Sequence, residues 1–197
     1  MPRIAIINQS DVTDADLALW VNAIQHQLHE DVAPFWALAN ETTLLTVPKG
    51  FTVPDGYWQV IISPTTDIAF DLGYHDRTSS RDPLGKVFTQ TTLEYRQTIS
   101  RVLSHEIIEM IADPEIETTV TIGATTYLAE ACDPVHYDAL GYPKLGVLVS
   151  DFVTPRYYGL PMPSEGVATS TLVSPVQYDL MALADQEPGR HAAEAVR

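Results

Sequence analysis

Cysteine, positive charge and long apolar runs are all scarce in this sequence. The single cysteine, Cys132, excludes an intramolecular disulfide. Only 11 Lys and Arg residues accompany 26 Asp and Glu residues, and the formal net charge of −15 argues against nucleic acid and anionic membranes as partners, because both repel an acidic surface. No apolar run approaches the ~20 residues that span a bilayer, and the apolar run that ends at Asn8 is too short for a signal peptide. We therefore expect a soluble protein.

The remaining composition is that of an ordinary globular protein, because 45% of the 197 residues are hydrophobic, enough for one sizeable core. After a cap by Asp11 or Thr13, apolar positions recur at helical spacing up to about Glu30. The polar stretch at residues 75–83 contains strong turn signals and is predicted to be a loop. Apolar and β-branched runs predict strands at residues 3–8, 42–47, 57–63, 68–74 and 85–89.

A second helix is predicted from about Tyr95 to Asp113, because Pro114 ends it. Beyond it, the sequence predicts a hairpin within residues 118–126 and strands at residues 145–153 and 172–178. The predicted fold class is therefore α+β: a mixed, twisted sheet with a backing helix and a functional helix, followed by a smaller, irregular, β-rich lobe. The predicted boundaries are 1–114 for the first part, 115–183 for the lobe and 184–197 for a mobile tail.

The second helix combines an apolar side with an acidic one. At about 100° per residue, His105, Glu109 and Asp113 lie along one side of the helix, and Glu106 falls in the same sector. Acidic side chains at the edge of a core are costly unless something neutralises them, and a divalent cation is the simplest partner. The adjoining sector is apolar and is expected to pack into the core through Ile99, Leu103, Ile107, Met110 and Ile111.

The spacing on this helix predicts a site for one divalent ion. His105 and Glu109 stand four residues apart, which lets two side chains of one helix bind the same ion. Glu106 is then free to act as the general base on a metal-bound water. Zinc is the first choice, although one histidine and two carboxylates also suit manganese, calcium or iron. The third ligand is expected to be Glu130, with Asp133 as the competing candidate; the weaker candidates are Asp113, Cys132 and His136.

Residues 103–109 resemble the active-site helix of the zincin metallopeptidases, with Glu109 where their second histidine usually stands. The element order over residues 1–112 is similar to the zincin upper subdomain, and Glu130 is similar to the third ligand of the glutamate-zincins. The resemblance implies a zincin-like fold and a metallopeptidase acting on peptides or proteins, with His105, Glu109 and Glu130 as ligands. It also implies that an edge strand, at residues 68–74 or 85–89, holds an extended substrate.

Two further assignments follow from chain position alone. In the polar loop, His75 is expected to lean over the site. After residues 154–155, Tyr157 or Tyr158 is expected to supply a donor to an oxyanion.

A second functional hypothesis belongs to a different class. Residues 104–114, 130–134 and 149–155 are similar to a group of small uncharacterised proteins in bacterial and bacteriophage genomes, a resemblance that implies no established activity. We expect a cytoplasmic or virion-associated location. The alternative is a non-catalytic structural or interaction protein of zincin fold, with an inert or structural ion. In the plainest interpretation, the acidic residues form a solvated face and His105 is a core-edge histidine. The oligomeric state stays open.

Overall fold

A computed structural model describes residues 1–122 and 124–161, and its centre is a mixed five-stranded sheet with the order β2-β1-β3-β5-β4. β2, β1, β3 and β5 run parallel, whereas β4 at the edge is antiparallel to β5. The predicted α+β class with a mixed sheet is confirmed. The strands are β1 (Arg3–Asn8), β2 (Thr43–Val47), β3 (Trp58–Ser63), β4 (Gly73–Arg77) and β5 (Pro83–Phe88).

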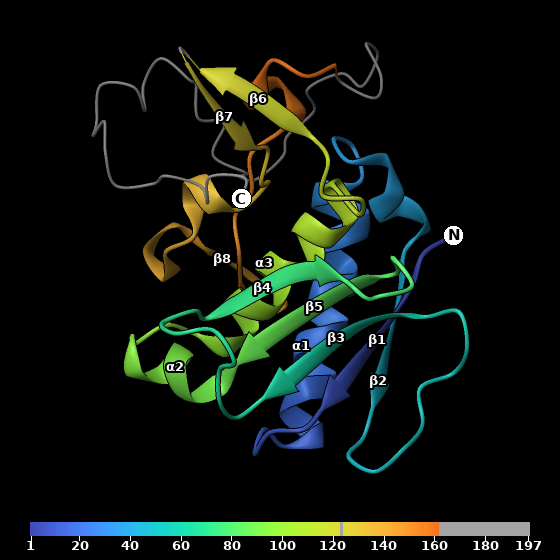
Figure 1. The fold of residues 1–197 in the computed structure, drawn as a ribbon. Helices are drawn as coiled ribbons and strands as arrows, with labels where there is room; N and C mark the ends of the chain where they lie inside the picture. Colours follow the sequence, from blue (N-terminus) through green and yellow to red (C-terminus); the bar gives the residue numbers. More distant parts are fainter. Residues whose placement is uncertain (123, 162–197) are drawn as a thin grey trace.

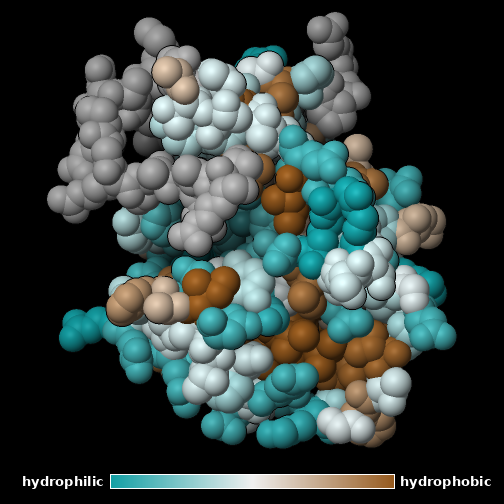
Figure 2. Space-filling view, in the orientation of Figure 1, coloured by the Kyte–Doolittle hydropathy of each residue, from teal (hydrophilic) through white to brown (hydrophobic). Residues whose placement is uncertain are grey.

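Two long helices, α1 (Asp14–Gln27) and α3 (Ile99–Ala112), lie behind the sheet in the view of Figure 1. Successive residues of a strand point to opposite faces, so every second residue of the central strands meets these helices. The intervening Ile7 and Ile61 are only half-buried, and Figure 2 shows apolar surface on this side of the sheet. The strand residues that share one core with the helices are Ile4, Ile6, Val60, Ile62 and Val87.

α1 begins where the sequence chemistry predicts. The Thr13 side chain accepts a hydrogen bond from the backbone N–H of Asp16 at 3.1 Å and so caps the first turn. The apolar side of the helix is buried, including Leu17 and Ile24. The regular helix is followed by a π-helical turn, Leu28–Val32, which contains the predicted end near residue 30.

The fourth strand lies later in the chain than predicted. Residues 68–72 form bends and turns, Phe70 has a φ of 72°, and β4 begins only at Gly73. The predicted loop at residues 75–83 is correspondingly shorter, and His75 lies on a strand instead of in that loop. β4 has one unpaired side in the sheet, and edge strands commonly carry polar residues. Because its sequence is polar, β4 lacks the alternation of apolar residues that predicts a strand.

The helix predicted from Tyr95 begins later, at Ile99. A short helix that was not predicted, α2 (Thr89–Glu94), comes first, and the chain bends between the two at Arg96, which has a φ of 56°. α3 ends at Ala112, ahead of Pro114, as predicted. Residues 100–111 are all buried, because α3 is in contact with β4 and β5 on one side and with the second part of the chain on the other.

The second part of the chain is irregular. The predicted hairpin consists of β6 (Thr119–Ile122) and β7 (Thr125–Leu128). A shorter pair joins β8 (Tyr142–Lys144) to β9 (Val147–Val149), so only residues 147–149 of the strand predicted at residues 145–153 are regular. The strand predicted at residues 172–178 and the tail predicted at 184–197 lie outside the described residues. Five-residue and shorter 3-10 turns complete the structure: Ala37–Glu41, Asp133–Val135, Asp138–Leu140 and Pro155–Tyr158.

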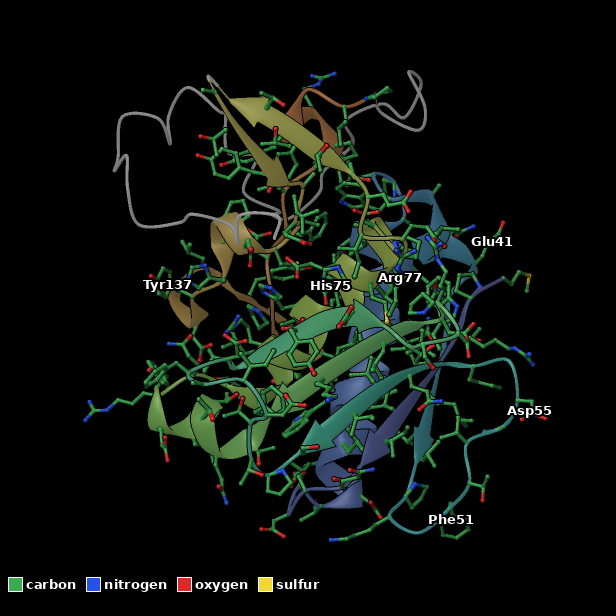
Figure 3. The ribbon with its side chains drawn as sticks, viewed as in Figure 1. Glu41, Phe51, Asp55, His75, Arg77 and Tyr137 are labelled. Carbon is green, nitrogen blue, oxygen red and sulfur yellow. The ribbon has the colours of Figure 1, made fainter. Side chains whose placement is uncertain are left out.

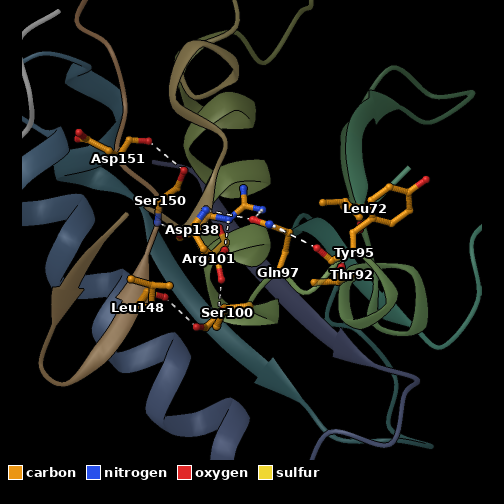
Figure 4. A network of polar contacts seen from close by, with 12 residues as sticks. Leu72, Thr92, Tyr95, Gln97, Ser100, Arg101, Asp138, Leu148, Ser150 and Asp151 are labelled. Carbon is orange, nitrogen blue, oxygen red and sulfur yellow. Dashed lines mark hydrogen bonds and ion pairs between the residues drawn. The ribbon is translucent and has the colours of Figure 1, made fainter. Parts of the chain in front are cut away.

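Polar contacts fasten this second part to the amino-terminal half of α3 (Figure 4). The buried Arg101 side chain donates from Nε to Asp138 Oδ1 at 3.0 Å. One turn later, the backbone N–H of Ser150 donates to Ser104 Oγ at 2.7 Å. These contacts hold the second part beside α3, so that residues 130–133 meet the following turns of the helix.

Candidate metal centre

The candidate site begins on the carboxyl-terminal half of α3. The exposed fractions of His105, Glu106 and Glu109 are 7%, 3% and 4%, so these three polar side chains are as buried as residues of the hydrophobic core. Side chains of this kind need partners when water is excluded. The partners come from residues 130–133 and from β4, where Figure 3 shows His75 beside α3.

His105 and Glu109 meet across one helical turn. His105 Nε2 lies 3.1 Å from Glu109 Oε2 and 3.4 Å from Asp133 Oδ1. Glu109 Oε1 accepts hydrogen bonds from the backbone N–H groups of Cys132 at 3.0 Å and Asp133 at 3.2 Å. Burial raises the pKa of Glu109, but His105 and His75 outweigh burial and hold this pKa well below its usual range. Glu109 is therefore a carboxylate, the form that binds cations.

His75 approaches the same carboxylate from β4. Its Nδ1 lies 3.5 Å from Glu109 Oε2, and its Nε2 lies 3.6 Å from Glu130 Oε2. Burial lowers the pKa of His75, but Glu109 and Glu130 outweigh burial and raise it to about 9. Burial, assisted by repulsion from Glu109, raises the pKa of Glu130 to about 8. In the absence of a metal ion, protons thus neutralise much of this buried acidity near neutral pH.

Glu106 is pressed against the edge strand. A Cβ atom added at Gly73 would lie 2.6 Å from Glu106 Oε1 and 2.7 Å from the backbone oxygen of Lys86, so this position of β4 has room only for glycine. Burial raises the pKa of Glu106 to about 8; the charge of His105 lowers it, and that of Glu109 raises it. A carboxyl group that titrates near neutral pH is suited to accept and return a proton during catalysis.

The two tyrosines proposed as oxyanion donors differ in their contacts. The Tyr158 hydroxyl donates to the backbone carbonyl of Glu130 at 2.6 Å and so supports the segment that carries this residue. The Tyr157 ring meets the Tyr158 ring edge-on, with 4.9 Å between the ring centroids. Tyr158 therefore positions the backbone at Glu130.

Two of the weaker ligand candidates have structural contacts instead. His136 Nδ1 lies 2.6 Å from the carbonyl oxygen of Asp133, within the turn that carries Asp133. The Asp113 carboxylate accepts the backbone N–H of Thr118 at 2.8 Å and fixes the exit from α3. Burial raises the pKa of the Cys132 thiol well above its ordinary value, which disfavours the thiolate that metal binding requires.

Two overlapping groups of side chains in the described residues can hold a metal ion. One group is His105, Glu109 and Cys132, and the other is His75, Glu106 and Glu109; within each, the ligand atoms lie within 4.8 Å of one another. The predicted pair His105 and Glu109 thus lies together. Glu130 is in neither group and faces His75. Nitrogen and oxygen donors in this combination suit zinc and the neighbouring divalent transition metals.

Three buried polar atoms at the site lack a hydrogen-bond partner among the described residues: His75 Nε2, His105 Nδ1 and Glu106 Oε2. Native proteins leave few buried polar atoms without a partner, and such atoms commonly face a water or an ion. The unpartnered polar atoms at this site, together with the nitrogen and oxygen donors around Glu109, fit a bound divalent cation.

The sequence predicted the site residues on α3 from their helical spacing, but it placed His75 in a loop beside the site, whereas His75 lies on β4. The only signal in the sequence was a histidine in a polar stretch between two predicted strands. The structure leaves both Glu130 and Asp133 as candidates, because Glu130 faces His75 and Asp133 faces His105.

Comparisons with known proteins assign no family. No protein-family model matches the chain, and no curated protein or solved structure matches it either. Across residues 1–122 and 124–161, no helix has both the length and the apolar character needed to cross a membrane. Any functional assignment therefore depends on the chemistry of the site itself.

Proposed function

We propose that this protein is a metal-dependent hydrolase, with peptides as its substrates and zinc as the first choice of ion. The observation that carries the proposal is the approach of two carboxylate oxygens to one buried imidazole nitrogen: His105 Nε2 lies 3.1 Å from Glu109 Oε2 and 3.4 Å from Asp133 Oδ1. His105 and Glu109 are the helical ligands. Asp133 or Glu130 supplies the acid from the second part of the chain.

Glu106 is the proposed general base and acid. A bound divalent ion would supply Lewis acidity, which acidifies a water and polarises the carbonyl group of the substrate. Glu106 takes one proton from the attacking water as the new carbon–oxygen bond forms, and it returns that proton to the leaving amine as the carbon–nitrogen bond breaks. Glu106 is buried beside His105 and Glu109, and the positive charge of a bound ion would favour its deprotonated, basic form.

The position of β4 supports peptides as the substrate class. Among residues 1–122 and 124–161, β4 is the edge strand of the sheet and pairs only with β5. An extended peptide can bind an unpaired strand edge through backbone hydrogen bonds. Because β4 also touches Glu106 through Gly73, a peptide on this edge would lie beside the proposed base. The same arrangement supports the resemblance to the zincin fold.

The test compares the wild-type protein with Glu106→Gln and with His105→Ala. We expect the purified wild type to contain one ion per chain, His105→Ala to contain none, and Glu106→Gln to keep the ion but to cleave a peptide library at least about a hundredfold more slowly. Glu94→Gln is the matched control, because Glu94 is an exposed glutamate on α2. Equal turnover by the wild type and Glu106→Gln would refute the peptidase mechanism.

The burial of the donors favours a second candidate, a structural ion in a non-catalytic protein of the same fold. His75, His105, Glu106 and Glu109 are almost inaccessible, whereas a catalytic ion needs an open position for water. This candidate predicts a stoichiometric ion, a large loss of thermal stability on metal removal, and no turnover by any of the proteins above.

A further inference from the structure

The thiol of Cys132 lies beside the two helical donors of the proposed site. In the group formed by His105, Glu109 and Cys132, the imidazole nitrogen, the carboxylate oxygen and the sulfur all lie within 4.8 Å of one another. Glu130 and Asp133, the acids considered above as third ligands, belong to no such group among the described residues. Within the described second part of the chain, Cys132 is therefore the residue that completes a set of three donors with the α3 pair.

The spacing of these three donors fits one small cation. Ligand atoms of a tetrahedral zinc ion stand about 3.3 to 3.6 Å apart, because bonds from zinc to nitrogen, oxygen and sulfur measure about 2.0 to 2.3 Å. Every pair of donors in the group is therefore within about 1.5 Å of the spacing that one ion requires. Small changes of side-chain torsion angles cover such a distance, so the backbone can stay where it is.

The backbone of Cys132 is held in place against α3. Its N–H donates to Glu109 Oε1 at 3.0 Å, and its carbonyl oxygen accepts the N–H of Val135 at 2.9 Å. One residue earlier, the carbonyl oxygen of Ala131 accepts the N–H of Val153 at 2.7 Å. The sulfur is thus positioned by hydrogen bonds on both sides of its residue, and a metal site needs its donors positioned in this way.

A role in the apolar core alone does not account for this placement. Cys132 belongs to the hydrophobic core, and a buried thiol commonly behaves as a small apolar residue. Its neighbours here, however, include a buried imidazole and a buried carboxylate. The imidazole is also incompletely partnered, because His105 Nδ1 has no hydrogen-bond partner among the described residues. Such atoms are rare in native proteins unless a water or an ion faces them, so a cation explains what an apolar contact leaves unexplained.

The charges of this donor set balance those of a divalent ion. A thiolate and the Glu109 carboxylate carry two negative charges together, and a neutral imidazole adds none. A divalent cation makes the set neutral, which lowers the cost of burying it. Burial holds the pKa of the Cys132 thiol well above its ordinary value in the ion-free protein, but a coordinating cation removes the thiol proton, which passes to solvent.

We infer that Cys132 is a metal ligand, so that one ion binds the imidazole of His105, the carboxylate of Glu109 and a thiolate from the second part of the chain. This ligand role rests on the metal site of the proposed function, and it adds a sulfur donor to the acids considered there. Thiolate ligands favour zinc over manganese, calcium and magnesium, which prefer oxygen donors. The choice among metals that the sequence left open is thereby narrowed to zinc.

The experiment loads the full, reduced chain with Co(II), a spectroscopic substitute for zinc, and records the near-ultraviolet charge-transfer band of cobalt–thiolate bonds. The chain contains a single cysteine, so this band can come only from Cys132. We expect the band at one cobalt per chain, with an intensity per chain that is independent of protein concentration. Independence of concentration excludes an ion that two chains share through their thiolates.

A variant and its control extend the measurement to affinity. In Cys132→Ser we expect the band to be absent and zinc affinity to be weakened at least about a hundredfold, beyond the ten- to hundredfold typical of outer residues. Val135→Ala is the matched control, because Val135 is equally buried in the next turn but offers no donor atom. It should retain the band. If circular dichroism shows that Cys132→Ser is unfolded, Cys132→Ala replaces it, and the wild-type spectrum is decisive by itself.

The outcomes separate the role of Cys132 from the proposed function. If the wild type binds one cobalt per chain without the band, and His105→Ala loses the ion, the inference is overturned and a site with an acidic third ligand stands. If His105→Ala retains the band, the inference is also overturned, because the thiolate then binds metal without α3. If the wild type binds neither cobalt nor zinc, both the inference and the proposed function fail.

Discussion

A stability measurement on the metal-free protein tests the electrostatics of the site without any assay of turnover. Burial raises the pKa of Glu106 from 4.5 to about 8 in the folded protein. The folded state therefore binds this proton more tightly than the unfolded state, and stability is lost as the pH rises from about 4.5 to about 8. At pH 7 this loss amounts to at most about 3 kcal/mol, at 1.36 kcal/mol per pKa unit.

Glu106→Gln removes this loss because glutamine stays neutral at every pH. In the presence of a chelator we expect the variant to be more stable than the wild type at pH 7, by up to about 3 kcal/mol, which corresponds to about 6–12 °C in Tm for a domain of this size. The difference should grow from pH 5 to pH 8. Thermal unfolding followed by circular dichroism measures it, with Glu94→Gln as the exposed control.

The reasoning is refuted if Glu106→Gln melts at or below the wild-type temperature at pH 8, or if the difference between the two proteins is the same at pH 5 and pH 8. Either result would mean that Glu106 is not desolvated in the way its burial indicates.

Three further predictions concern other contacts. Gly73→Ala should lower turnover at least about tenfold, because the added Cβ would lie 2.6 Å from Glu106 Oε1 and 2.7 Å from the backbone oxygen of Lys86, so Glu106 and the pairing of β4 with β5 must shift; kinetics measure this, and wild-type turnover would contradict it. Zinc affinity should rise up to about tenfold per pH unit between pH 6 and 8, because binding by the candidate ligand Glu130, whose pKa is about 8, displaces its proton; titration calorimetry in two buffers would show the released proton, and a flat profile would contradict the displacement. Asp138→Ala should destabilise the protein by about 3 kcal/mol, because it leaves the buried Arg101 without its carboxylate; urea unfolding measures this, and a loss under 1 kcal/mol would contradict it.

The parts of the fold that the sequence predicted are those in which local chemistry and hydrophobic periodicity agree. Thr13 caps α1, Pro114 limits α3, and apolar runs mark β1, β2, β3 and β5. Along β1, β3 and β5, apolar residues that identify the strand are also among those that it buries. Local sequence was therefore sufficient.

The position of β4 and the bend before α3 could not be predicted from local sequence. β4 is polar because it lies at an edge, and its register depends on pairing with β5, a contact between segments that the pattern does not reveal. The bend at Arg96 requires a positive φ that arginine rarely adopts, so no residue type announces it. The site residues on α3 followed from helical spacing, whereas the place of His75 depended on the strand that was missed.

Glu109 has two contacts that make ion binding inseparable from the conformation of residues 132–133. One carboxylate oxygen faces the imidazoles, and the other holds the backbone of Cys132 and Asp133 onto α3. Thermodynamic coupling is reciprocal. An ion that fixes Glu109 therefore also stabilises its hydrogen bonds to the backbone of residues 132–133, and weakening these hydrogen bonds lowers the affinity for the ion. Amide hydrogen exchange at Cys132 and Asp133 should consequently slow when the protein takes up metal, which makes two backbone N–H groups remote reporters of occupancy.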